Sequence, residues 1–435
     1  MTTVQPLSEL LPSEPVQKGD FVLLGFPDVN GLLRGKALRR EAFGAALREG
    51  TTMTDLLLAL DPTDTPITSY ERFGLRSGAG DLVIHGEEST VRELSWLPGW
   101  QVCLATPSWR DGSACELASR EVLRRTLRQM QELGFDTLAA IEYEIRLRDA
   151  GGRPLSAAMS YSFEQVSAFE AYLGRLVPAL DALGIELTAV HTEAGPGLLE
   201  LNLAARDGLR AADDACYVKL AAKAIAASMG LSASFLAKTA PGEEGSSGHI
   251  HISCWREGAN GFTSEDLLEA AVAGVLGHLP AASLLLGPTV NSYKRLVPGW
   301  FAPVNVSWGV ENRSAAVRVI APADHPERYR VECRRPGADA NPYLALAVLV
   351  ASAADGITRG AKPPPPVQGD ASERHDLPAL PASLESALAA FAGDDVLRAA
   401  LGPEFSDYYA ASRRWELEQW QQAVSDWERE RYSPL

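Results

Sequence analysis

Glu142 and Glu144 lie two residues apart in the apolar stretch 139–145. A β-strand alternates its side chains between two faces, so these two carboxylates would point to the same side. Two surface carboxylates solvated by water are one interpretation of the pair. The apolar neighbours favour the other interpretation, a buried strand, and buried carboxylates need a cation or another partner.

Two further segments carry the same kinds of side chain. Glu193 and Glu200 flank a Gly-Pro-Gly turn, and a Gly- and Ser-rich loop precedes His249, His251 and Ser253. The last three alternate along a predicted strand and therefore share one face. Carboxylates and imidazole are metal ligands, and an oxygen-rich set favours Mg²⁺ or Mn²⁺. We therefore predict a metal site that borders a loop for a ligand or a nucleotide.

Arginines dominate the chemistry of the second half of the chain. They are Arg295, Arg313, Arg318 and those of the segment Arg330-Val-Glu332-Cys-Arg334-Arg335. A structural ladder of ion pairs would explain any one of them. Arginines around a divalent cation suit phosphoryl transfer better, because the cation bridges phosphate oxygens and the guanidinium groups neutralise charge that develops in the reaction.

Composition excludes several other classes of protein. The 435 residues include 40 Lys+Arg and 56 Asp+Glu, a net charge of −16, which is unfavourable for nucleic-acid binding. No run of about 18 uninterrupted apolar residues predicts a membrane span, and residues 1–20 lack the layout of a secretory signal. The five scattered cysteines, without C-x-x-C spacing, fit a reducing compartment. We expect a cytoplasmic protein with no nucleic-acid or membrane partner.

The elements that must position these residues follow from periodicity and from capping signals. Helices are predicted at 119–133 with Ser119 as N-cap, at 163–183, 209–229, 265–279 and 342–358, and two or three more between 380 and 432. Strands are predicted at 21–26, 81–85, 135–147, 185–190 and 249–255, and Pro363–Pro366 reads as a stiff linker. This order predicts a small β-rich domain, residues 1–105, before an α+β or α/β catalytic domain, residues 106–435.

In this order and spacing, the motifs resemble those of glutamine synthetase. They are Glu-x-Glu at 142–144, His-x-Glu-x-Gly-Pro-Gly-x-x-Glu at 191–200, Gly-Ser-x-x-His-x-His-x-Ser at 245–253, Asn-Ser-Tyr-Lys-Arg-Leu-Val-Pro-Gly at 291–299, Asn-Arg-Ser-Ala at 312–315 and Arg-x-Glu-x-Arg at 330–334. The resemblance runs from about Phe21 to the C-terminal helices. It implies an α+β fold with an N-terminal β-grasp domain and a curved antiparallel sheet. It also implies a homo-oligomer, commonly a dodecamer of two hexameric rings, with active sites shared between neighbouring subunits.

The resemblance also implies roles for single residues. One metal ion would be bound by Glu144, Glu193 and Glu200 and a second by Glu142, His249 and Glu332, with two to three Mg²⁺ or Mn²⁺ per site. ATP would contact His251, Ser253, Arg318 and Arg330, and glutamate would contact Gly245, Arg295 and Arg334. Arg313 would stabilise the transferred phosphoryl group. The catalytic residues would therefore be Arg313, Arg295 and Arg334. In the implied reaction, the side-chain carboxylate of glutamate accepts the γ-phosphoryl group of ATP, and a nitrogen nucleophile then displaces phosphate.

Phe301 departs from the family pattern. After Val-Pro-Gly, glutamine synthetases carry a glutamate that shields the intermediate and takes a proton from ammonium, whereas this chain has Trp300 and Phe301. A phenyl ring accepts no proton, and general-base assistance typically contributes about 10²- to 10⁴-fold in rate. Trp300, Phe301 and Trp308 are candidates to line a pocket for an organic amine. The alternative is that Trp300 and Phe301 only pack this segment against the protein.

A second acid of the family, an aspartate of the N-terminal domain, helps bind ammonium in a neighbouring subunit. Its position falls near Thr54, with Asp55 and Asp61 nearby, so its loss stays open. For a polyamine substrate, Glu244, Asp55 and Glu311 are possible acidic residues of the pocket.

We therefore expect an ATP-dependent ligase that joins the γ-carboxyl group of glutamate to an organic primary amine, such as a polyamine, ethanolamine or another monoamine. A glutamine synthetase that uses ammonia and a non-catalytic structural or sensing homologue are the alternatives.

Overall fold

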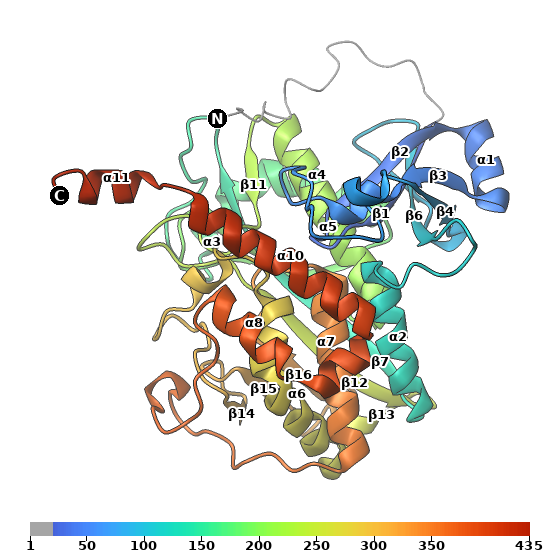
Figure 1. The fold of residues 1–435 in the computed structure, drawn as a ribbon. Coiled ribbons are helices and arrows are strands. Elements are labelled where there is room, and N and C mark those ends of the chain that lie inside the picture. Colours follow the sequence, from blue (N-terminus) through green and yellow to red (C-terminus); the bar gives the residue numbers. More distant parts are fainter. Residues whose placement is uncertain (1–20) are drawn as a thin grey trace.

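The computed structural model describes residues 21–435, so the prediction that concerns residues 1–20 lies outside it. Figure 1 shows two bodies: a small β-sheet with one helix, and a larger part in which long helices cover a second sheet. The predicted α+β class is confirmed. The predicted domain boundary after residue 105 falls inside the last strand of the first sheet, which ends at Ser108.

The first sheet is mixed. Its elements are β1 (Phe21–Pro27), β2 (Leu33–Arg39), α1 (Arg40–Glu49), β3 (Thr51–Thr54), β4 (Asp81–Gly86), β5 (Arg92–Glu93) and β6 (Trp100–Ser108). The strand order is β2-β1-β6-β4-β3, with β5 paired to β6 and β1 parallel to β6. Val22, Leu24 and Phe26 of β1 alternate into the core, as a half-buried strand requires.

The second sheet is largely antiparallel and carries the predicted site. Its main strands are β7 (Asp136–Arg148), β8 (Leu187–Thr192), β9 (Leu198–Leu203), β12 (Gly248–Arg256), β14 (Trp308–Val310), β15 (Val317–Ile320) and β16 (Arg330–Cys333), in the order β14-β15-β16-β12-β7-β9-β8. The short strands β10 (Arg206–Asp207), β11 (Ser232–Ser234) and β13 (Ala259–Asn260) pair at its margins.

Helices form most of the remaining core. They are α2 (Ser119–Glu132), α3 (Phe163–Val166), α4 (Glu170–Ala182), α5 (Gly208–Ser228), α6 (Glu265–Leu286), α7 (Pro342–Arg359), α8 (Leu384–Ala392), α9 (Asp395–Leu401), α10 (Pro403–Gln422) and α11 (Asp426–Tyr432). In Figure 1, α11 extends from the end of α10 away from the body of the protein. The buried Arg120 of α2 links the two bodies, because it pairs with Asp213 of α5 at 2.8 Å and with Glu87 at 2.5 Å.

Several local predictions were wrong. Ser119 is the first residue of α2 and not its N-cap, because its hydroxyl donates to the carbonyl of Asp28 instead. The helix predicted at 163–183 is divided by a 3₁₀ turn at Ser167–Phe169. The helix predicted to end at Leu279 continues past Pro280 to Leu286, and four helices, not two or three, follow Leu380 in the described chain.

Among the described residues, α6 is the helix long and apolar enough to span a membrane by length and composition. However, 67% of its most apolar window is buried inside the protein, as in a core helix. All five cysteines are unpaired and buried.

Helices α6 and α7 approach closely at two glycines. A methyl group on Gly274 would fall on the carbonyl oxygen of Ser352, and one on Gly356 would fall on the carbonyl oxygen of Ala270. The two helix backbones can pack this closely only because both positions lack a side chain.

Gly274→Ala therefore tests the contact. We expect the free energy of unfolding in urea to fall by about 1–3 kcal/mol, the usual cost of overpacking. Gly277→Ala on the same helix is the matched control, since nothing lies within 4 Å of that position. It should be neutral or stabilising by up to about 1 kcal/mol, because Ala favours a helix over Gly. Equal effects of the two variants would contradict the close approach.

Candidate active site

The register of the large sheet places the predicted metal ligands beside one another. Glu142 of β7 lies opposite His249 of β12, and Glu144 of β7 lies opposite Glu200 of β9. On the other side of β12, His251 lies opposite Glu332 of β16. Directly opposite residues on one face have neighbouring side chains, so four strands together form one acidic patch.

A cavity of about 640 Å³ opens over this patch. All six predicted metal ligands line it: Glu142, Glu144, Glu193, Glu200, His249 and Glu332. The predicted substrate and catalytic residues Gly245, Arg295, Trp300, Phe301, Arg313 and Arg334 line it too, together with Arg318.

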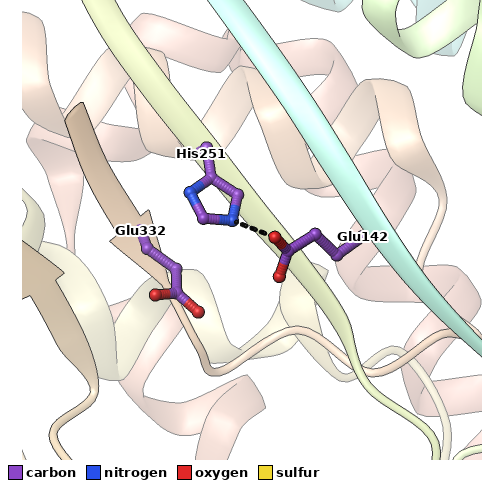
Figure 2. A group of neighbouring side chains, drawn as sticks. All are labelled: Glu142, His251 and Glu332. Atoms are coloured by element: carbon purple, nitrogen blue, oxygen red, sulfur yellow. Dashed lines mark ion pairs between the residues drawn. The ribbon is translucent and has the colours of Figure 1, made fainter. Parts of the chain in front are cut away.

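Two groups of side chains in the patch could each hold a metal ion, and they differ in part from the predicted sets. Glu142, His251 and Glu332 form one group, and His191, Glu193 and Glu200 form the other, with ligand atoms within 4.8 Å of one another in each. Figure 2 shows the first group, in which His251 Nε2 lies 3.1 Å from Glu142 Oε1. His249, the predicted ligand, lies nearby, with Nδ1 3.5 Å from Glu332 and 3.8 Å from Glu142.

Two carboxylates of the patch, Glu144 and Glu200, carry negative charge that the protein alone does not fully balance. Burial, then the charge of Glu193, raises the pKa of Glu144 to about 7. Burial and the charges of Glu142 and Glu144 also raise the pKa of Glu200 well above its usual value. Crowded carboxylates of this kind are stabilised when a cation lies between them.

His249 is also prepared for a metal ion. Burial, then the charge of Arg334, lowers its pKa to about 4, so the imidazole is neutral near pH 7, the form that binds metals. Its Nε2 atom is buried and has no hydrogen-bond partner. The oxygen-rich donor set and the Nδ1 atom of His249, which faces Glu142 and Glu332, fit a divalent cation such as Mg²⁺ or Mn²⁺.

Three arginines retain donors for an anionic ligand. Arg334 and Arg318 pair with Glu332 at 2.5 and 3.1 Å, so part of the alternative ion-pair ladder is present. Arg295 donates to the carbonyl oxygens of Arg335 and Pro336 at 2.6 and 3.1 Å. The Nε atoms of all three arginines are nevertheless buried without a hydrogen-bond partner. Phosphate or carboxylate oxygens are the natural acceptors for such groups.

A second cavity of about 640 Å³ adjoins the first and shares Glu142 and Asn202 with it. It contains the other predicted nucleotide residues, His251, Ser253 and Arg330, beside Trp255 and Tyr329. Aromatic and aliphatic walls suit a base, and Arg330 at the Glu142 end suits phosphates. Arg318 instead lines the first cavity.

Two of the three aromatic residues predicted for the amine pocket, Trp300 and Phe301, line the first cavity. Phe301 is 64% exposed, so it does not simply pack its segment against the protein. Trp300 lines the cavity, but the ammonium of Lys238 already lies over its ring, 4.4 Å from the centroid. Trp308 is buried, donates to the carbonyl of Pro364 and is not among the lining residues, so its predicted place in the pocket was wrong.

Sequence reasoning missed His191, Tyr161 and Asn202. His191 Nε2 lies 2.9 Å from Glu193, and Tyr161 stacks on the His191 ring with centroids 4.2 Å apart. Asn202 donates to Glu200 at 2.8 Å. His191 opens the motif that contains Glu193, and Asn202 follows Glu200 at strand spacing, so both were detectable. Tyr161 comes from a separate loop and carries no such signal.

The two candidates for the family's N-terminal aspartate, Asp55 and Asp61, lie outside the first cavity. Asp55 accepts from the backbone of Gly74 at 3.0 Å, and Asp61 accepts from Thr63 and Thr65. Neither lines the cavity. Of the other candidate acids, Glu311 pairs with Arg318 at 2.5 Å, and Glu244 lies in the cavity lining.

Comparison with known proteins agrees with this geometry. The model of the glutamine synthetase catalytic domain matches residues 116–432. The chain belongs to the glutamine synthetase family. As a member it is an ATP-dependent ligase that forms carbon–nitrogen bonds.

Relatives of this chain include enzymes named for organic amines and an enzyme named glutamine synthetase. The γ-glutamylethanolamide synthetase GlnA4 of Streptomyces coelicolor is 34% identical, over 94% of this chain and 91% of its own. A glutamate–isopropylamine ligase of Pseudomonas is 32% identical over 95% of each chain. The glutamine synthetase of Thermus thermophilus is 36% identical over 74% of this chain and 76% of its own. A crystal structure described as a novel glutamine synthase homologue superposes with a TM-score of 0.83 at 27% identity, covering 95% and 98% of the two chains.

The unbalanced charge predicts how metal affects stability. The pKa of Glu200 is higher in the folded protein than in the unfolded chain, so its ionisation as the pH rises costs folding free energy in the metal-free protein. Glu200→Gln should therefore raise the melting temperature of metal-free protein at pH 8 by a few degrees. It should also remove most of the increase in melting temperature that Mn²⁺ gives the wild type.

Glu186→Gln is the control for this experiment, because Glu186 is an exposed carboxylate in a surface pair with Arg206. It should leave both melting temperatures almost unchanged. A metal-free Glu200→Gln protein that is less stable than the wild type at pH 8 would contradict the crowding of negative charge.

Proposed function

We propose that the chain joins the γ-carboxylate of glutamate to an organic primary amine, with hydrolysis of ATP to ADP and phosphate. Phe301 carries the proposal. Its exposed phenyl ring lines the cavity at the position where the family resemblance predicts a proton-accepting glutamate. An apolar ring there disfavours ammonium and offers contact area to the carbon skeleton of a larger amine.

The relatives support both this proposal and its rival. A relative named for a γ-glutamylethanolamide product and one named for the substrate isopropylamine are 34% and 32% identical to this chain, which favours an organic amine. A named glutamine synthetase is 36% identical over a shorter match, which favours ammonia. Overall identity therefore does not separate the two functions, and the residue at position 301 is the more specific argument.

The proposed roles follow the two cavities. Glu144, Glu193 and Glu200 would hold one divalent cation, and Glu142, His249 and Glu332 a second, with His191 and His251 beside them. Mg²⁺ or Mn²⁺ held there, two to three per site, would supply positive charge that neutralises the phosphates of ATP. His251, Ser253, Arg318 and Arg330 would bind ATP. Gly245, Arg295 and Arg334 would bind glutamate, and Arg313 would contact the phosphoryl group while it is transferred.

The reaction then has two steps. A γ-carboxylate oxygen of glutamate attacks the γ-phosphorus of ATP, and ADP leaves. The amine nitrogen attacks the acyl carbon of γ-glutamyl phosphate, and the bond from that carbon to the phosphate oxygen breaks. Starting from the ammonium form of the amine, one proton leaves with phosphate and one goes to solvent. Arg295, Arg313 and Arg334 would stabilise the negative charge that develops on the transferred group.

We also propose that the protein is cytoplasmic and forms a dodecamer of two hexameric rings. The five unpaired cysteines support the compartment. The assembly rests on family membership, and in such a ring an N-terminal acid such as Asp55 would come from a neighbouring subunit.

The amine preference is tested by phosphate release with glutamate, ATP and a panel of amines, with products identified by mass. We expect organic amines to exceed ammonia in kcat/KM. Phe301→Glu should raise kcat/KM for ammonia about ten-fold or more and lower it for the larger amines, because it restores a proton acceptor.

Phe301→Gln is the matched control, since it has the shape of Glu without the charge. This variant should have a lower kcat/KM for the larger amines and no higher kcat/KM for ammonia. A wild-type enzyme whose kcat/KM with ammonia equals that with the best organic amine would overturn the proposal.

A further inference from the structure

Glu244 is a carboxylate in the cavity that the proposed chemistry does not use. It is half-buried and lines the cavity beside Gly245, Ser247 and Trp300. Within the described part of the chain, its side chain makes no hydrogen bond or ion pair. A carboxylate that is partly removed from water costs folding free energy. The charges of Arg146 and Lys238 offset this cost only in part, so a cationic ligand would offset the remainder.

The backbone around Glu244 is held in place. The guanidinium of Arg146, itself buried, donates to the carbonyl oxygen of Glu244 at 2.7 Å. A side chain at Gly245 would collide with the side chain of Arg295, so this loop lies directly against a proposed glutamate-binding residue. The backbone N–H of Ser246 donates a hydrogen bond to the carbonyl oxygen of Ala237 at 2.9 Å. The position of the carboxylate therefore follows from a fixed loop.

The neighbouring residue Glu243 shows the contrast. Its carboxylate pairs with Arg148 at 2.9 Å and accepts from the hydroxyl of Thr239 at 2.9 Å. Glu243 does not line the cavity. Two consecutive glutamates thus have different surroundings: Glu243 pairs directly with an arginine, whereas Glu244 lines the cavity and feels the charges of Arg146 and Lys238 only at longer range.

Glu244 also lies near the aromatic wall. Lys238 donates to the backbone carbonyl of Glu243 and places its ammonium over Trp300, which connects the loop with this wall. The backbone of Lys238 is held in turn by two hydrogen bonds of 2.9 Å with the amide side chain of Asn291. Because Lys238 already occupies a face of Trp300, that face is not available for cation–π contact with a substrate.

We propose that the carboxylate of Glu244 binds the ammonium group of the incoming amine and so determines the affinity for organic amines. This inference rests on the proposed function. Alkylamines resemble the lysine side chain, whose pKa is about 10.4, so they arrive as cations near neutral pH. Glu244 holds the charged head, and Phe301 contacts the carbon skeleton. The carboxylate thereby supplies the negative charge that position 301 lacks.

Steady-state kinetics of Glu244→Gln test this role, with ethanolamine and isopropylamine as probes. The variant loses a hydrogen bond between two charged groups. We therefore expect KM for each amine to rise roughly ten- to a hundred-fold. KM for glutamate and for ATP should stay within about two-fold of the wild type. Hydroxylamine, a weakly basic nucleophile that is uncharged at neutral pH, should react with an almost unchanged KM.

Glu243→Gln is the matched control, because it removes an adjacent carboxylate that faces Arg148 instead of the cavity. It should leave KM for both amines unchanged. Melting temperatures show that each variant is folded, and KM for ATP shows that its nucleotide site is intact.

Three results would overturn the assignment. A rise in KM for glutamate with an unchanged KM for amines would mean that Glu244 binds the α-ammonium group of glutamate. An equal loss with hydroxylamine would mean that charge recognition is not its role, and an unchanged KM for all substrates would mean that it has none. If the wild-type enzyme uses ammonia alone, the proposed function itself is contradicted. If the wild-type enzyme uses organic amines and Glu244→Gln uses them equally well, only this inference is contradicted.

Discussion

The concentration of negative charge on one face of the large sheet is the constraint on which the rest of the structure depends. Cross-strand pairing brings the carboxylates of β7, β9 and β16 together, and burial raises the pKa of Glu144 and Glu200. Arg318 and Arg334 pair directly with Glu332, whereas the β7 carboxylates have no arginine or lysine ion pair in the described chain and Glu200 of β9 has only the imidazole of His191, at 3.5 Å. Divalent cations would stabilise such a patch, which is why the proposed metal binding and phosphoryl transfer share one surface.

The scaffold and the substrate side of the cavity differ in how they are built. The predicted metal ligands lie on strands, apart from Glu193, so their spacing is set by the pleat and by backbone pairing. The residues that would meet the amine, Glu244 and Phe301, lie on loops. A rigid centre with variable loops lets one family keep its phosphoryl chemistry while the nitrogen donor changes. This division is consistent with the similar identity that relatives named for different products and substrates share with this chain.

Local sequence predicted element types well where one physical signal dominates and failed where tertiary contacts compete with it. The alternating strand 135–147 and the apolar helix 342–358 match β7 and α7 within a residue or so at either end. Ser119 failed as an N-cap because its hydroxyl bonds to Asp28, which is distant in the sequence. The helix at 163–183 failed because a single 3₁₀ turn divides it without a Gly or Pro to signal the break.

The sequence by itself determined the chemistry available to the site: the residue types, their strand spacing and the absence of a proton acceptor at Phe301. Alternation along a strand depends only on local backbone geometry, which is why the shared face of Glu142 and Glu144 was predictable. Only the tertiary structure decided which groups meet. It placed His251 closer to Glu142 than His249, at 3.1 Å against 3.8 Å, and set Lys238 over Trp300. It also paired Glu243 with Arg148, while Glu244 makes no hydrogen bond or ion pair in the described chain. These outcomes depend on strand register and on contacts between distant segments, which local patterns do not encode.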